Sequence, residues 1–173
     1  YAMGGVLFID EAYLLLDKDG DAGQQAAGVL LKAMEDNKNE FVVIMAGYED
    51  NINRLLASNE GFASRIKHKI YFDDFSADEM VEIFKMQLNN YSKNNNYTID
   101  KHGLEMLYKH FEKEKRVPGF GNARVVRNAL DKILDNHADN FMNGKLKPEQ
   151  KYIITDKDII EYIEVRQKQM LDD

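Results

Sequence analysis

The chain has 173 residues, of which 44% are hydrophobic, and this size and hydrophobic content suit one domain or two small ones with a buried core. The net charge of -7 argues against a broad nucleic-acid-binding surface, and the lack of cysteine excludes disulfides, a thiolate nucleophile and cysteine-based zinc sites. No apolar run approaches the roughly 20 residues that span a bilayer, so we expect no membrane partner.

Residues 6–9 are four consecutive apolar residues, Val-Leu-Phe-Ile, that run directly into Asp10 and Glu11. A strand that is apolar on both faces is typical of the middle of a parallel sheet with helices on both sides. Ligands bind beyond the carboxyl ends of such strands, so the two carboxylates are candidate site residues. The alternative is a core strand followed by a solvated acidic turn. Because this strand starts almost at once, with no element before it, we expect an N-terminal truncation.

The next elements predict a strand-helix-strand unit. A polar loop over 17–21 precedes a helix over 22–34 with one apolar face, and residues 41–46 form a second apolar strand. The connection between parallel strands should be right-handed. Tyr48 follows the second strand and is therefore expected at the same sheet edge as the acidic pair.

A helix over 51–57, a loop through Gly61 and a third strand over 70–72 complete the predicted sheet portion. Everything after residues 73–75 has a helical pattern. We therefore expect an α/β domain over 1–74 and a helical domain over 75–173.

The helical part is predicted to contain four helices. The first begins with a capping box, in which Ser76 and Glu79 satisfy each other's backbone amides. After a polar loop over 89–96, Asp100 caps the second helix. A long helix over 122–143 ends at Gly144, and a final helix follows Thr155 and Asp156.

Three arginines are candidates for contacts with an anion. Arg65 follows a loop, where the edge of a subunit would present it to a neighbouring subunit. Arg124 and Arg127 lie three residues apart at the start of the long helix, on nearly one face. The alternative for each is an ordinary exposed surface charge.

The order of these features resembles that of AAA+ ATPases. The local sequence is similar to the CbxX/CfqX-like branch, which contains the red-type Rubisco activases and the stage V sporulation protein K-like ATPases. The matching segments cover nearly the whole chain and are GGVLFIDEAY at 4–13, GQQA at 23–26, AGY at 46–48, SNEGFASRI at 58–66 and GNAR at 121–124. The resemblance implies an α/β fold, the C-terminal part of an AAA+ P-loop NTPase domain with a parallel sheet, followed by a small all-α lid domain.

The resemblance also implies roles for individual residues. Asp10 is expected as the Walker B aspartate that holds Mg²⁺ through water, and Glu11 as the general base. Tyr48 stands where many AAA+ proteins have a sensor 1 asparagine. Its hydroxyl therefore either makes the sensor 1 contact with ATP or makes no contact with ATP. Arg65 is expected as the arginine finger of the neighbouring subunit's site, and Arg124 as sensor 2.

The cofactors implied are ATP and Mg²⁺, and the implied assembly is a homo-oligomeric ring, a hexamer, that remodels a client protein. Location in the cytoplasm, or in the plastid stroma of a red-lineage alga, fits this branch. No G-x-x-x-x-G-K-[ST] motif occurs in the chain, so we expect this polypeptide alone to be inactive. The alternatives are a non-catalytic scaffold or adaptor that binds through its lid, and a DNA-acting AAA+ protein such as a clamp loader, which the net acidity disfavours.

Overall fold

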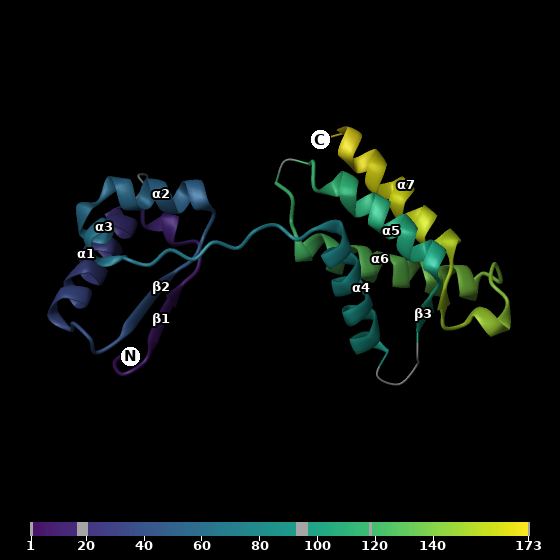
Figure 1. Ribbon diagram of the computed structural model, residues 1–173, viewed down its shortest axis with the longest axis horizontal. Helices are drawn as coiled ribbons and strands as arrows, with labels where there is room; N and C mark the ends of the chain where they lie inside the picture. Colours follow the sequence, from purple (N-terminus) through teal and green to yellow (C-terminus); the bar gives the residue numbers. More distant parts are fainter. Residues whose placement is uncertain (1, 17–20, 93–96, 118, 173) are drawn as a thin grey trace. The chain divides into compact units, whose positions relative to one another are not determined.

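The computed structural model describes residues 2–16, 21–92, 97–117 and 119–172. The chain divides into two compact units, Tyr1–Tyr71 and Phe72–Asp173. In Figure 1 the first unit is coloured purple to blue and the second teal to yellow. The polar loop predicted at 17–21 lies almost entirely outside the described residues.

The first unit confirms the predicted strand-helix-strand pattern. Strands β1 and β2 are parallel and pair in the register Val6 with Val42 through Ile9 with Met45. The elements in chain order are β1 (Val6–Ile9), the 3-10 helix η1 (Ala12–Leu16), α1 (Asp21–Asp36), β2 (Val42–Met45), α2 (Glu49–Ser58) and α3 (Glu60–Arg65). At the start of α1, a Cβ on Gly23 would lie 3.0 Å from the carbonyl oxygen of Leu14. Only glycine lets this helix approach η1 so closely.

One face of the β1–β2 pair is covered and the other is open. The inward side chains of both strands pack with a core that includes the fully buried Leu55 and Phe62. On the opposite face, Phe8 is 59% exposed and Val42 is 56% exposed. The expectation of a strand covered on both faces is therefore wrong for the described part of this unit, because its helices pack on one side of the sheet (Figure 1).

Two further expectations for this unit are corrected. Residues 70–72 do not form the predicted third strand, since Ile70 is 80% exposed and no backbone hydrogen bond joins these residues to a described strand. A strand exists only through such pairing. The predicted loop through Gly61 is instead the short helix α3, which starts there because the Asn59 side chain accepts a hydrogen bond from the Gly61 amide (2.9 Å).

The second unit contains the four predicted helices, α4 to α7. Their bounds are α4 (Ala77–Tyr91), α5 (Lys101–Glu114), α6 (Ala123–Met142) and α7 (Asp156–Asp172), with β3 (Thr98–Ile99), η2 (Pro148–Gln150) and β4 (Ile153–Ile154) between them. The Ser76 amide donates to Glu79 (2.8 Å), which confirms the capping box, and Asp100 caps α5 through the Gly103 amide (2.7 Å). Strands β3 and β4, which pair in parallel, are too short for a sequence pattern to reveal. Where the loop over 89–96 was expected, α4 continues to Tyr91, and residues 93–96 lie outside the described ranges.

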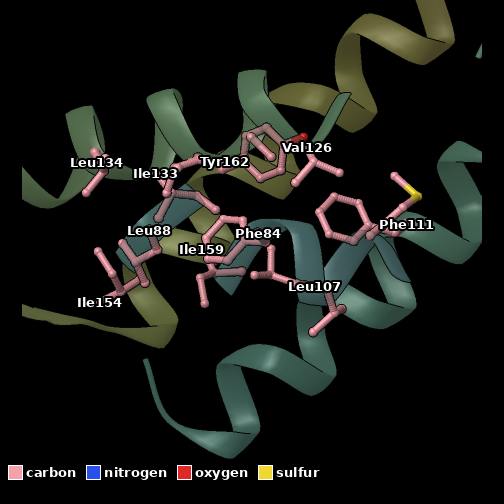
Figure 2. Packing of buried hydrophobic residues seen from close by; sticks show 14 of the residues in the cluster. Phe84, Leu88, Leu107, Phe111, Val126, Ile133, Leu134, Ile154, Ile159 and Tyr162 are labelled. Carbon is pink, nitrogen blue, oxygen red and sulfur yellow. The ribbon is translucent and has the colours of Figure 1, made fainter. Parts of the chain in front are cut away.

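The core of the second unit lies between its helices, where side chains from α4, α5, α6 and α7 converge (Figure 2). Beside it, the buried Asp158 carboxylate accepts hydrogen bonds from Asn140 (2.8 Å) and from both the amide and the hydroxyl of Thr155, and it contacts His137 (2.9 Å). Burial alone would raise the pKa of Asp158, but these hydrogen bonds outweigh it and the pKa is lowered. Among the described residues, no helix is long and apolar enough to cross a membrane.

Candidate active site at the carboxyl ends of strands β1 and β2

The candidate site lies where β1 and β2 end side by side. Beyond the last strand residues, the Ala46 amide donates to the Ile9 carbonyl (2.9 Å) and the Ala12 amide donates to the Ala46 carbonyl (3.0 Å). These bonds hold the residues after β1 against the residues after β2. The predicted juxtaposition of the acidic pair with Tyr48 therefore follows from the parallel register.

Glu11 has an unusual backbone conformation and one unsatisfied carboxylate oxygen. Its φ of 48° lies in the left-handed region, which non-glycine residues rarely adopt and which often marks functional sites. The Asp10 carboxylate accepts a hydrogen bond from the Glu11 amide (3.0 Å). Glu11 Oε2 is buried and has no hydrogen-bond partner among the described residues. A buried acceptor without a partner is costly, so this oxygen is suited to receive a ligand or a water molecule.

Tyr13 joins this cluster from η1. Its ring lies close to Gly47, where an added Cβ would be 3.3 Å from Tyr13 Cδ1. A hydrogen bond to the Glu11 carboxylate is the main reason that the pKa of Tyr13 is raised, followed by burial and by the charges of Glu11, Tyr48 and Asp10. Tyr48 itself is 68% exposed at the start of α2. One rim therefore presents two carboxylates and two phenols.

The contact between Glu11 and Tyr13 predicts a titration result. The substitution Glu11→Gln removes the negative charge that disfavours tyrosinate, so we expect the pKa of Tyr13 to fall toward its ordinary value of 10.0. The measurement is a pH titration of the Tyr13 ring carbon by NMR, assigned with Tyr13→Phe. Glu40→Gln, at the other end of β2, should leave this pKa unchanged. An unaltered Tyr13 pKa in Glu11→Gln would show that the charge of Glu11 does not raise it, because glutamine can still accept a hydrogen bond from the phenol.

The residues present fit a magnesium ion held together with a phosphate ligand. Among the described residues, no group of three or more histidine, aspartate or glutamate side chains forms a metal cage. Mg²⁺ usually keeps several waters and binds through one or two carboxylates plus substrate phosphates, without a dedicated protein cage. The exposed Asp10 carboxylate, beside the unpartnered Glu11 oxygen, offers that kind of site.

Arg65 is in the same unit but is not brought to the acidic pair. It ends α3, and its guanidinium forms an ion pair with Glu35 near the end of α1 and donates to the Gly61 carbonyl (3.0 Å). Helix α1 leads back to the start of β2, which is the opposite end of the strands from the candidate site. Arg65 Nε is buried without a hydrogen-bond partner in the described ranges. Hydrogen bonds from Lys38 and then from Arg65 lower the pKa of Glu35.

Arg124 and Arg127 belong to the second unit. Both are exposed in the first turns of α6, and neither side chain has a hydrogen bond or ion pair with the described residues. The Arg124 amide donates to the Gly121 carbonyl (3.0 Å) at the helix start. Both guanidinium groups are therefore accessible to an anionic ligand.

Family models match both units of the chain. Residues 2–74 match the model described as "ATPase family associated with various cellular activities (AAA)", and residues 76–169 match the AAA lid domain. The chain belongs to the AAA ATPase family. This assignment confirms the α/β core and the all-α lid, and the part of the second unit that starts at Ser76 is called the lid below.

The relatives of this AAA chain include proteins of the branch that its motifs resemble. It is 38% identical to a CfxQ homolog of Galdieria sulphuraria over 92% of this chain and 50% of that protein. It is 41% identical to protein CbbX of Cereibacter sphaeroides over 85% of this chain and 47% of that protein. The chain thus spans about half the length of these curated relatives. The resemblance to the red-type Rubisco activase-like branch is confirmed.

A solved structure has the same fold. A closed-state cryo-EM reconstruction of Hsp104 with ATPγS and FITC-casein matches 95% of this chain and 27% of that chain, with a TM-score of 0.68 and 18% sequence identity. At this identity the likeness extends to the fold alone.

Sequence reasoning missed the contact of Tyr13 at the site and the pairing of Glu35 with Arg65 away from it. Tyr13 stands inside the matching segment GGVLFIDEAY, and that segment was the available signal for its role. The pairing of Glu35 with Arg65 joins residues 30 positions apart, and no local pattern indicates it.

Proposed function

We propose that this chain is the Walker B, sensor and lid portion of an AAA+ ATPase that hydrolyses ATP to remodel a protein partner. The observation that carries the proposal is the arrangement at the ends of β1 and β2, where exposed Asp10 adjoins Glu11 with its buried, unpartnered Oε2. The boundary between ATPase core and lid falls at residues 74 and 75, which is supported by family models that end at 74 and begin at 76.

In this proposal Asp10 holds Mg²⁺ through water beside the phosphates of ATP, and Mg²⁺ when bound neutralises phosphate charge. Glu11 Oε2 orients the attacking water and accepts its proton as the water oxygen bonds to the γ-phosphorus and the bond to ADP breaks. Tyr48 is the candidate sensor 1 residue. Its exposed hydroxyl lies on the same rim and is available to a phosphate oxygen.

Two arginines complete the proposed machinery. Arg65 acts as the arginine finger in the site of the neighbouring subunit, for which it leaves Glu35. This role is supported by its attachment to the end of α1, away from the acidic pair of its own unit. Arg124 acts as sensor 2, by which the lid contacts the bound nucleotide. These roles require a ring, and we propose a homo-hexamer.

For this chain, a location in the cytoplasm is compatible with bacterial relatives such as CbbX. A location in a plastid is compatible with the CfxQ homologues of Galdieria sulphuraria and Pyropia yezoensis.

The proposal is tested by joining the chain, at its N-terminus, to the family's upstream segment with its phosphate-binding loop. We expect the extended chain to hydrolyse ATP in the presence of Mg²⁺, and the chain alone to show no useful hydrolysis. Asp10→Asn should lower hydrolysis by at least about a hundredfold, because the metal contributes several kcal/mol to the transition state. A phosphate-release assay measures the rate of hydrolysis by the extended chain, by the chain alone and by Asp10→Asn.

Asp50→Asn, in the first turn of α2, is the matched control and should keep activity. An extended chain that folds and binds a protein partner but never hydrolyses ATP would support the scaffold instead. Salt-dependent DNA binding would support the clamp-loader alternative.

A further inference from the structure

Asn122 stands immediately before α6 in a conformation that asparagine rarely adopts. Its φ is 54° and its ψ is -127°, and only glycine takes up this region of backbone angles readily. An asparagine at this position of a helix usually caps it by accepting a hydrogen bond from a following amide. The Asn122 side chain makes no such capping bond. The strained backbone and the missing cap both indicate that the side chain serves another purpose.

The side chain of Asn122 instead binds the segment that enters the lid. Its Oδ1 accepts a hydrogen bond from the Phe75 amide (3.0 Å), and its Nδ2 donates to Asp74 Oδ1 (2.8 Å). These two partners lie 47 and 48 positions earlier in the chain. They are the residues by which the chain, coming from the first unit, reaches α4.

The same segment is also tied to α4. The Ser76 amide donates to the Glu79 carboxylate (2.8 Å), and the Glu79 amide donates back to the Ser76 hydroxyl (3.2 Å). These bonds hold Ser76 against the first turn of α4. Residues 74–76 are therefore hydrogen-bonded to the starts of two helices. Asp74 and Phe75 bond to Asn122 before α6, and Ser76 bonds to Glu79 in the first turn of α4.

Arg124 is two residues beyond Asn122 in the first turn of α6. The Val125 amide donates to the Asn122 carbonyl (3.0 Å), so Asn122 is continuous with the hydrogen-bonded start of the helix that carries the arginine. A displacement of this helix end by a ligand at Arg124 would move the Asn122 side chain, and with it Asp74 and Phe75.

We propose that Asn122 is a positioning residue that links the sensor 2 helix to the segment connecting the ATPase core with the lid. This inference rests on the proposed function, because it takes Arg124 as the residue that contacts nucleotide. Asn122 does not touch the nucleotide itself. It passes a shift of the α6 start to the backbone through which the lid is attached to the core.

The first test measures the link without any nucleotide. Asn122→Gly keeps the backbone conformation and removes only the side chain, so we expect the lid to stay folded. In the 173-residue chain, hydrogen exchange of the Phe75 amide, followed by NMR, should accelerate at least about tenfold, because this amide loses one hydrogen bond. Asp74→Asn is the matched control, because its side-chain carbonyl still accepts from Asn122, and its Phe75 exchange should match wild type.

A swapped pair separates the link from a general structural role. Asn122→Asp alone places two carboxylates together and should accelerate Phe75 exchange. Combined with Asp74→Asn, the new asparagine donates to the new aspartate, so the double variant should return exchange to near the wild-type rate. Equal Phe75 exchange in wild type and Asn122→Gly, or no rescue by the swap, would overturn the proposal.

The second test uses ATP hydrolysis by the N-terminally extended chain. We expect Asn122→Gly to lower kcat about tenfold, by the loss of one hydrogen bond, with recovery in the swapped pair. Arg124→Ala is run in parallel, with Lys132→Ala, at an exposed cation further along α6, as its control. If Arg124→Ala hydrolyses ATP normally, the sensor 2 assignment fails, and the inference fails with it even if the exchange result holds. If Arg124→Ala is impaired while Asn122→Gly is fully active, only the inference about Asn122 fails.

Discussion

Replacing Glu11 by glutamine should lower the kcat of the N-terminally extended chain by about 10²–10⁴, the usual contribution of a positioned general base. Glutamine has nearly the same shape as glutamate, but its amide is not a base that can take a proton from water. Because Asp10 and the arginines are unchanged, nucleotide affinity should stay close to wild type. Single-turnover hydrolysis measures the rate, and titration with a fluorescent ATP analogue measures affinity.

The matched control for this variant is Glu40→Gln, the same change at the opposite end of β2. It should leave both the rate and the affinity unchanged. Full hydrolysis by Glu11→Gln would remove Glu11 as the base. Loss of binding in Glu11→Gln, with the lid and core still folded, would instead assign Glu11 to nucleotide affinity.

Removing the Arg65 side chain should lower ring-dependent hydrolysis by about 10³ or more, the contribution typical of an arginine finger. The physical reason is that the guanidinium neutralises charge on the transferring phosphoryl group. Arg65→Ala also frees Glu35, which keeps its contact with Lys38 (2.8 Å). Hydrolysis is assayed at concentrations where mass photometry shows the ring.

Mixing two inactive variants tests whether Arg65 acts on its neighbour. Arg65→Ala retains the Glu11 base, and Glu11→Gln retains the finger. If each site combines a base from one subunit with a finger from the next, an equal random mixture should recover about a quarter of the wild-type sites. No recovery in mixed rings would place Arg65 in its own subunit's site or outside catalysis. Arg54→Ala, an exposed arginine on α2, is the control and should remain active.

The candidate site could be predicted in part because its central residues are neighbours in sequence. Asp10 and Glu11 follow an apolar strand directly, and the parallel arrangement of two such strands places Tyr48 at the same rim. The contribution of Tyr13 could not be derived this way, because it depends on the turn that η1 makes after Glu11. The contact between Glu35 and Arg65 could not be predicted from the sequence either, since it depends on how α3 packs against α1.

The helices of the lid and their caps were determined by the sequence itself. A capping box such as Ser76 with Glu79, or a helical stripe of apolar residues, depends on side chains within about four positions of one another. Such patterns predict the same local structure whatever the fold of the rest of the chain. For the same reason the acidic pair after an apolar strand was recognisable from the sequence alone.

Only the tertiary structure decided which faces are covered and which distant residues meet. An apolar strand is compatible with one covered face or two, and the choice depends on the elements that pack against it, so the open face with Phe8 and Val42 was not predictable. Residues 70–72 have a strand-like composition, but a strand needs a hydrogen-bonding partner. The link from Asn122 to Asp74 spans 48 positions, and closing so long a loop depends on the packing of the whole lid, which no local pattern records.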